Sequence, residues 1–305
     1  MAEGPTMPSP LIFDRGLIRA HRRRAVLIGP ATFLLDRVAE ELGERLAVVL
    51  RRFDLALDLG TPGEAVRVAL SRLGSVGAII AADAISVSNA ASAPPFVVAD
   101  EEALPFRDAA FDLMVSALAL QFVNDLPGVL VQIRRALKPD GLFLAALIGG
   151  ETLTELRQSF AAAESEIEGG ASPHVAPFAD LRDLGALLQR AGFALPVADA
   201  DRITVRYDSV FALMYDLRRM AATNALIDRR RVPLKRATLM RMAEIYRERF
   251  ADEDGRVRAT FEILWLSGWA PHPSQQQPLK PGSAQTRLAD ALGSREISAG
   301  EKAGR

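Results

Sequence analysis

The chain has 305 residues, of which 49% are hydrophobic and 25% are charged, and its formal net charge is −1 at pH 7. This composition is typical of a globular domain large enough for a well-buried core, and the small net charge argues against nucleic acid as a partner. The sequence contains no cysteine, which excludes disulfide bonds, zinc–thiolate and iron–sulfur sites and a thiol nucleophile. No stretch of about 18 uninterrupted apolar residues occurs, so no membrane span is predicted.

The N-terminal part of the chain begins with residues 1–10, which include three prolines and are expected to form a flexible tail. The stretch from Arg15 to Arg24 is rich in arginine. It fits either a transit peptide or the solvated basic face of a helix, and we favour the second interpretation. In residues 33–50 the apolar positions recur at spacings of three and four, which predicts a helix.

From residue 55 onward, short apolar runs alternate with helical patterns. The expected strands cover residues 55–60, 78–82, 95–99, 111–116 and 142–147. A helix is expected over 129–137, before the turn formed by Lys138-Pro139-Asp140-Gly141. Strands separated by helices indicate βαβ units. The sequence therefore predicts an α/β, Rossmann-like domain with a seven-stranded, mainly parallel sheet and helices on both faces.

The second half of the chain continues the same domain, which we expect to cover residues 11–273. A helix is predicted over 180–191 and a strand over 201–207. Two helices, 210–222 and 237–250, form a helical insertion at about 208–252, before a final strand over 257–265. The chain then becomes rich in Pro, Gln, Ser and Gly, so residues 274–305 are expected to be a disordered tail.

The residues with the clearest chemical meaning follow the first strands. Asp58-Leu59-Gly60-Thr61-Pro62-Gly63-Glu64 stands where a strand passes into a helix, and ligands of such sheets bind at the carboxyl ends of the strands. Asp83 follows the next strand, about 20 residues after Gly60, at the spacing of an acid that binds ribose hydroxyls. Asp100 and Glu101 follow the third strand, where they would lie beside the base. Each acid has an alternative role as a helix cap or a loop charge, and for Asp83 the two interpretations are balanced.

The order of these segments resembles the class I S-adenosylmethionine (SAM)-dependent methyltransferases. The segments that carry the resemblance are Asp58-Leu59-Gly60, Asp83, VADEEALPF at 98–106, FDL at 111–113 and LKPDG at 137–141. The chain is similar to the malonyl-carrier methyltransferase of biotin synthesis. It is more similar to the respiratory complex I assembly factor of mitochondria that has a methyltransferase fold. The closer similarity, over about residues 11–283, rests on SALALQFVNDLP at 116–127, GGETLTELR at 149–157, SPHVAPF at 172–178 and Gly268-Trp269.

The resemblance implies a SAM site and a neighbouring substrate site. The implied cofactor-binding residues are Asp58, Gly60, Gly63, Asp83, Asp100, Glu101 and Ser116. The implied substrate residues are Gln121, Glu151, Arg157 and His174. A surface salt bridge is the alternative for Arg157, and a structural role is the alternative for His174. No catalytic residue is identified, because methyl transfer from SAM requires mainly proximity and in-line orientation.

The glycine loop departs from the pattern of the family. The usual motif is acid-x-Gly-x-Gly-x-Gly, whereas Pro62 and Glu64 replace the second and third glycines here. Pro62 has no N–H to donate, and Glu64 adds a negative charge near the expected position of the SAM carboxylate. Both changes are expected to weaken SAM binding.

The function remains open between three interpretations. The first is a SAM-dependent methyltransferase that acts on a small molecule or on a protein side chain in complex I assembly. The resemblance also implies an assembly factor that hydroxylates an arginine, and the altered loop suggests a non-catalytic scaffold. Hydroxylases usually use iron or flavin, but the three histidines are far apart and form no His-x-Asp or His-x-Glu pair, so no metal site is predicted. The expected partner is a complex I subunit. The expected location is the bacterial cytoplasm, with peripheral association at the inner face of the membrane as an alternative.

Overall fold

The computed structural model describes residues 11–85, 95–276, 286 and 288–295. They belong to two units, residues 1–271 and 272–305. The second unit contains the short helix α9 (Leu288–Leu292), within the tail that was expected to be disordered; most of that tail, and the predicted tail 1–10, lie outside the described residues. The first unit contains the sheet and the candidate site.

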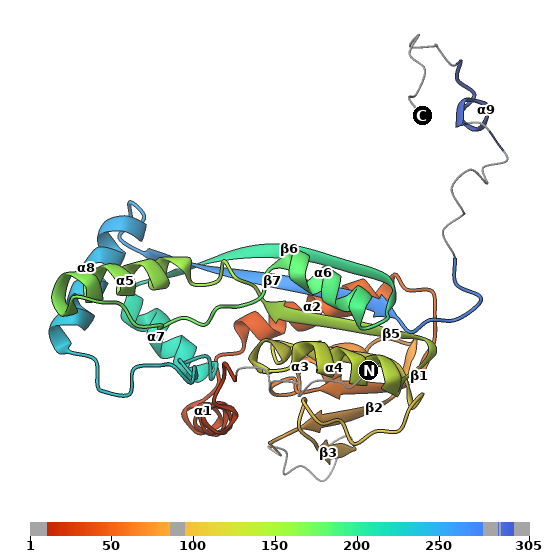
Figure 1. Cartoon of the computed structure of the whole chain (residues 1–305), viewed down its shortest axis with the longest axis horizontal. Coiled ribbons are helices and arrows are strands. Elements are labelled where there is room, and N and C mark those ends of the chain that lie inside the picture. The colour runs from red at the N-terminus through yellow and green to blue at the C-terminus, as the bar shows by residue number, and fades with distance from the viewer. Residues whose placement is uncertain (1–10, 86–94, 277–285, 287, 296–305) are drawn as a thin grey trace, which may run out of the picture. The chain divides into compact units, whose positions relative to one another are not determined.

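A seven-stranded sheet forms the centre of the first unit, with strand order β3-β2-β1-β4-β5-β7-β6 (Figure 1). The strands are β1 (Phe53–Leu59), β2 (Val76–Asp83), β3 (Phe96–Val98), β4 (Phe111–Ala117), β5 (Leu137–Ile148), β6 (Ala194–Tyr207) and β7 (Val257–Trp269). Neighbouring strands from β3 to β5 are parallel, and β7 is antiparallel to both β5 and β6. The order reverses between β1 and β4, which is where ligands of such sheets bind. The predicted fold class is confirmed.

Helices cover both faces of this sheet. They are α1 (Arg15–Ile28), α2 (Phe33–Ala47), α3 (Ala65–Ser71), the 3₁₀ turn η1 (Leu120–Phe122), α4 (Leu126–Ala136), α5 (Thr154–Glu168), α6 (Leu181–Arg190), α7 (Val210–Arg219) and α8 (Arg236–Phe250). Side chains alternate between the faces of a strand, so Ala56 belongs to the core beneath α2 and α3, and Leu57 to the core beneath α4 and α6. Both cores are closed by apolar helix faces, which explains the helical periodicity of the sequence.

Several segments differ from the sequence-based expectation. The turn expected at Lys138-Pro139-Asp140-Gly141 belongs to β5, which already begins at Leu137 because that residue pairs with Phe111 of β4. The strand expected to begin at residue 201 is β6, which begins at Ala194. Its first half was not recognised in the sequence because acidic residues interrupt the apolar alternation; one of them, Asp199, binds Arg45 of α2. The arginine-rich stretch is α1, which packs against α7, and Phe13 and Ile18 form a small core with Ala225 and Leu226. In the described part of the chain, no helix is both long and apolar enough to cross a bilayer.

Candidate functional site

The candidate site lies at the carboxyl ends of β1 to β4. Asp58 is in β1, Asp83 ends β2, and Asp100 and Glu101 follow β3. Ser116 in β4 donates a hydrogen bond from Oγ to the carbonyl oxygen of Leu59 at 2.8 Å. The parallel register therefore brings these residues of the predicted cofactor set to one edge of the sheet.

Arginines of α1 form ion pairs with the carboxylates at this edge of the sheet. Arg22 donates from both terminal nitrogens to Asp83, with 3.0 Å between Nη1 and Oδ1, and its Nη2 also reaches the carbonyl oxygen of Gly60 at 3.2 Å. Arg15 donates to Asp100 at 2.8 Å and also contacts Glu101. A further α1 arginine, Arg19, pairs with Asp100 as well. The interpretation of this stretch as a solvated basic face was therefore wrong, because three of its arginines bind acids that come 61 to 86 residues later in the chain.

The burial of these acids changes their titration. Asp58 is 1% exposed, and burial raises its pKa to about 6 despite the nearby Thr61 hydroxyl and Arg67 guanidinium. Arg67 of α3 donates to Asp58 Oδ2 at 2.8 Å and is itself largely buried. Burial also raises the pKa of Asp83 above its ordinary value, although Arg22 favours the charged form. These carboxylates depend on their arginines to remain charged.

The glycine loop after β1 has two left-handed positions. Gly60 has φ +71° and Gly63 has φ +77°, a region that glycine enters without the steric cost of a side chain. A Cβ on Gly60 would lie 2.9 Å from Glu101 Oε1, whereas a Cβ on Gly63 would meet no atom within 4 Å. Glu64 turns outward: its side chain is 61% exposed and lies 4.0 Å from Arg67. The charge that was expected to weaken SAM binding is therefore directed to solvent, and the missing N–H of Pro62 is the remaining defect of the loop.

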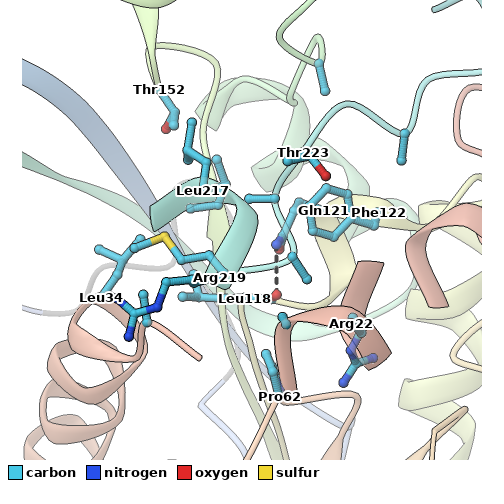
Figure 2. Close-up of a pocket in the computed structure, with 18 of the residues that line it drawn as sticks. Arg22, Leu34, Pro62, Leu118, Gln121, Phe122, Thr152, Leu217, Arg219 and Thr223 are labelled. Atoms are coloured by element: carbon cyan, nitrogen blue, oxygen red, sulfur yellow. Dashed lines mark hydrogen bonds between the residues drawn. The ribbon is translucent and has the colours of Figure 1, made fainter. Parts of the chain in front are cut away.

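A cavity of about 350 Å³ adjoins this loop. Pro62, Gly63 and Ile85 line it together with residues of α1, α2, α5 and α7, and most of its surface is apolar (Figure 2). Arg22 and Arg219 are in its wall, and no aspartate or glutamate belongs to its described lining. It has the size and the mainly apolar character of a small-molecule or side-chain pocket.

Two of the four predicted substrate residues line this cavity. Gln121 donates from Nε2 to the carbonyl oxygen of Leu118 at 2.8 Å, and within the described residues its buried Oε1 has no hydrogen-bond partner (Figure 2). His174 also lines it. Arg157 instead donates to the carbonyl oxygens of Gly150 and Thr152, and Glu151 lines a separate, smaller pocket.

His174 is held by a residue that sequence reasoning missed. Glu164 is 1% exposed, and although burial acts against it, hydrogen bonds from His174 and Ser172 lower its pKa. The Nε2 atom of His174 lies 2.9 Å from Glu164, and the imidazole stacks on Phe160 with 3.9 Å between ring centroids. Nothing in the sequence pattern links Glu164, in mid-helix, to the loop that contains His174. A buried carboxylate that fixes one imidazole nitrogen leaves the other free for a ligand.

We expect neutral His174 to carry its proton on Nε2, because the carboxylate of Glu164 can only accept a hydrogen bond. Nitrogen-15 NMR of the imidazoles can test this, since the chain has only three histidines. Glu164→Gln should alter the Nε2 signal of His174 and leave those of His21 and His272 unchanged. A neutral His174 with its proton on Nδ1 would contradict the assignment.

Comparison with known proteins places this site in a family context. Residues 57–145 match a methyltransferase domain family. The chain is 44% identical to the human protein named arginine-hydroxylase NDUFAF5, mitochondrial, over 94% of this chain and 85% of that protein. The zebrafish protein of the same name is 40% identical over 92% and 89%. A malonyl-[acyl-carrier protein] O-methyltransferase from Laribacter hongkongensis is 41% identical, over 63% of this chain and 62% of that protein.

Solved structures show the same fold at low sequence identity. A Bacillus halodurans protein assigned to the methyltransferases is 18% identical and has a TM-score of 0.52, with 77% of this chain and 99% of that chain covered. The YcgJ protein of Bacillus subtilis gives a TM-score of 0.50 at 17% identity, with coverages of 76% and 98%. The mitochondrial relatives also correct one expectation, because they contradict the predicted location in the bacterial cytoplasm.

Proposed function

Since the chain belongs to the family of the mitochondrial arginine-hydroxylase NDUFAF5, we propose that it is a SAM-binding enzyme that modifies a side chain of a partner protein, with a subunit of respiratory complex I as the partner. The observation that carries this proposal is that the acids at the ends of β2 and β3 (Asp83, Asp100 and Glu101, the strand-end acids) lie next to the cavity. Asp83 ends β2 and binds Arg22, which also lines the cavity beside Pro62 and Gly63. A nucleoside and a side chain could thus be held next to each other.

The residues of this chain fit SAM in part. Gly63 leaves open space beside the loop, and the cavity next to it has volume enough for an aliphatic side chain. Asp83 has the position of a ribose-binding acid, but its oxygens already accept hydrogen bonds from Arg22 and from the backbone N–H of Ile85. Both sites of Oδ1 and one site of Oδ2 are therefore taken, so a ribose diol can bind both oxygens only if Arg22 releases Asp83 first.

In this proposal, SAM supplies the activated methyl group and the chain supplies position. The wall, which includes Leu34, Leu118 and Leu217, is mainly apolar and offers contacts to the aliphatic part of the side chain that is modified. Gln121 Oε1 and, with the imidazole proton on Nε2, His174 Nδ1 can accept hydrogen bonds from an N–H group of the side chain that is modified. The described lining has no carboxylate to pair with a guanidinium and includes Arg22 and Arg219, so it favours an uncharged side chain such as an amide over a cationic one.

Calorimetric titration with SAM and S-adenosylhomocysteine tests the cofactor. We expect saturable binding that Asp83→Asn weakens by about tenfold or more, the size of a lost hydrogen bond to a charged group. Asp54→Asn is the matched control, because Asp54 is an exposed acid at the opposite end of β1. If neither nucleoside binds the wild-type protein or any variant at millimolar concentration, the scaffold interpretation replaces this proposal.

Arginine hydroxylation is the second candidate, and the name of the human and zebrafish relatives favours it. That reaction inserts one oxygen atom into a C–H bond, and dioxygen with a two-electron reductant is the class of co-reactant it requires. Among the described residues, no three His, Asp or Glu side chains are grouped as metal ligands. Mass spectrometry of complex I arginines, in strains with and without the gene, distinguishes an added oxygen from an added methylene group.

A further inference from the structure

Three arginines of α1 form one face of the helix, and this face binds the strand-end acids. Arg15, Arg19 and Arg22 are four and three positions apart, so they lie on the same side of the helix. Together they contact Asp83, Asp100 and Glu101. The face meets all three acids that the sequence predicts for a nucleoside.

Arg22 is the member of this face that matters most for a ribose. Its two terminal nitrogens bind both oxygens of Asp83, and one of them also binds the carbonyl oxygen of Gly60. Its side chain is 19% exposed, and that of Asp83 is 8% exposed. Charge-assisted, bidentate hydrogen bonds with this degree of burial are strong. A ribose diol needs the same carboxylate oxygens, so Arg22 and a ribose cannot both bind Asp83 in this way.

The helix that contributes Arg22 also forms part of the cavity wall. Arg22, Ala25 and Val26 all line the cavity, on the same helix. At the end of α1, Leu27 is 85% exposed, and Arg219 donates from Nε to the carbonyl oxygen of Gly29 at 2.7 Å, so this contact also has to break when the helix moves. A displacement of α1 would therefore uncover the strand-end acids and widen the cavity in a single movement.

We propose that α1 is an intramolecular competitor of the nucleoside: Arg22 occupies the ribose-binding carboxylate, and a nucleoside enters only when α1 leaves. The inference rests on the proposed nucleoside site, and it adds that the closed form is the resting state of the protein. The apparent affinity for a nucleoside is then reduced by the fraction of molecules in the closed form.

The test compares two neighbouring arginines of α1. Arg22→Ala removes the competitor, and Arg22→Gln repeats the change with a longer side chain in case the alanine variant folds poorly. Arg23→Ala is the matched control, because the side chain of Arg23 is exposed and has no ion pair or hydrogen bond within the described part of the chain. The measurements are calorimetric titration of each protein with S-adenosylhomocysteine, and hydrogen exchange of α1 amides with and without it.

We expect Arg22→Ala and Arg22→Gln to bind S-adenosylhomocysteine about tenfold more tightly than the wild type, and Arg23→Ala to match the wild type. In the wild type, saturation with the nucleoside should increase amide exchange in α1. Equal or weaker binding by the Arg22 variants, or unchanged protection of α1 in the saturated wild type, would overturn the proposal that α1 competes with the nucleoside. The proposed nucleoside site would not be affected by that result. Absence of binding in every protein would overturn the competitor and the proposed function together.

Discussion

Arg67→Ala is expected to lower the free energy of unfolding by about 3–5 kcal/mol, the usual cost of removing one partner of a buried ion pair. Asp58 is 1% exposed, and Arg67 is its guanidinium partner at 2.8 Å. Without Arg67, the carboxylate would remain in the sheet with no cation to compensate its charge. Urea unfolding measured by circular dichroism gives the change directly.

The control for this variant lies one turn further along the chain. Arg72→Ala, at the end of α3, removes an exposed arginine and should change stability by no more than about 0.5 kcal/mol. Adding Asp58→Asn to Arg67→Ala should restore part of the loss, because the uncompensated charge is then gone. A loss below about 1 kcal/mol in Arg67→Ala would mean that the pair contributes little.

The same pair predicts an unusual dependence of stability on pH. The pKa of Asp58 is about 6 in the folded protein and 3.8 in its ordinary environment, so between these values the folded state binds more protons than the unfolded state. The contribution of Asp58 to stability is therefore lost as the pH rises through this window. Relative to Asp58→Asn, the wild type should lose about 2–3 kcal/mol between pH 4 and pH 7. An unchanged difference between the two proteins would contradict the raised pKa.

Gly60→Ala is expected to cost about 2–5 kcal/mol, whereas Gly63→Ala should cost about 1–2 kcal/mol. Both glycines have a positive φ, which costs an L-residue about 1–2 kcal/mol. Only at Gly60 does the new methyl group also collide, at 2.9 Å from Glu101 Oε1 and 3.0 Å from the Cβ of Ala119, and overpacking of this kind adds about 1–3 kcal/mol. Thermal unfolding of the two variants measures the difference. Equal losses of stability would contradict the close contact of residue 60 with Glu101 and Ala119.

The sheet was predictable from the sequence because its signals are local. Apolar runs of the length of a strand, bounded by acids and glycines, identify β1 to β5. The site was only partly predictable. Asp58 and Asp83 lie at the ends of β1 and β2, and Asp100 follows β3, so the rule for parallel sheets brings them together. The partner of Asp83 is 61 residues away on α1, and no periodicity in the sequence encodes that contact.

The pair Glu164–His174 illustrates the same limit over a shorter distance. Only ten residues separate the two side chains, yet Glu164 belongs to a regular helix and His174 to a loop. Their contact depends on how that loop folds back over α5. The sequence leaves two interpretations of His174 open, a structural and a substrate-binding one, and its contact with a buried carboxylate is compatible with both.

The position of β7 in the sheet has a consequence for synthesis on the ribosome. β7 lies between β5 and β6, although both are made before it. Until residue 269 has left the exit tunnel, β5 and β6 each present an open edge of unpaired backbone groups, and such edges template association between chains. Nascent chains halted before residue 257 should therefore be the species that most requires a chaperone.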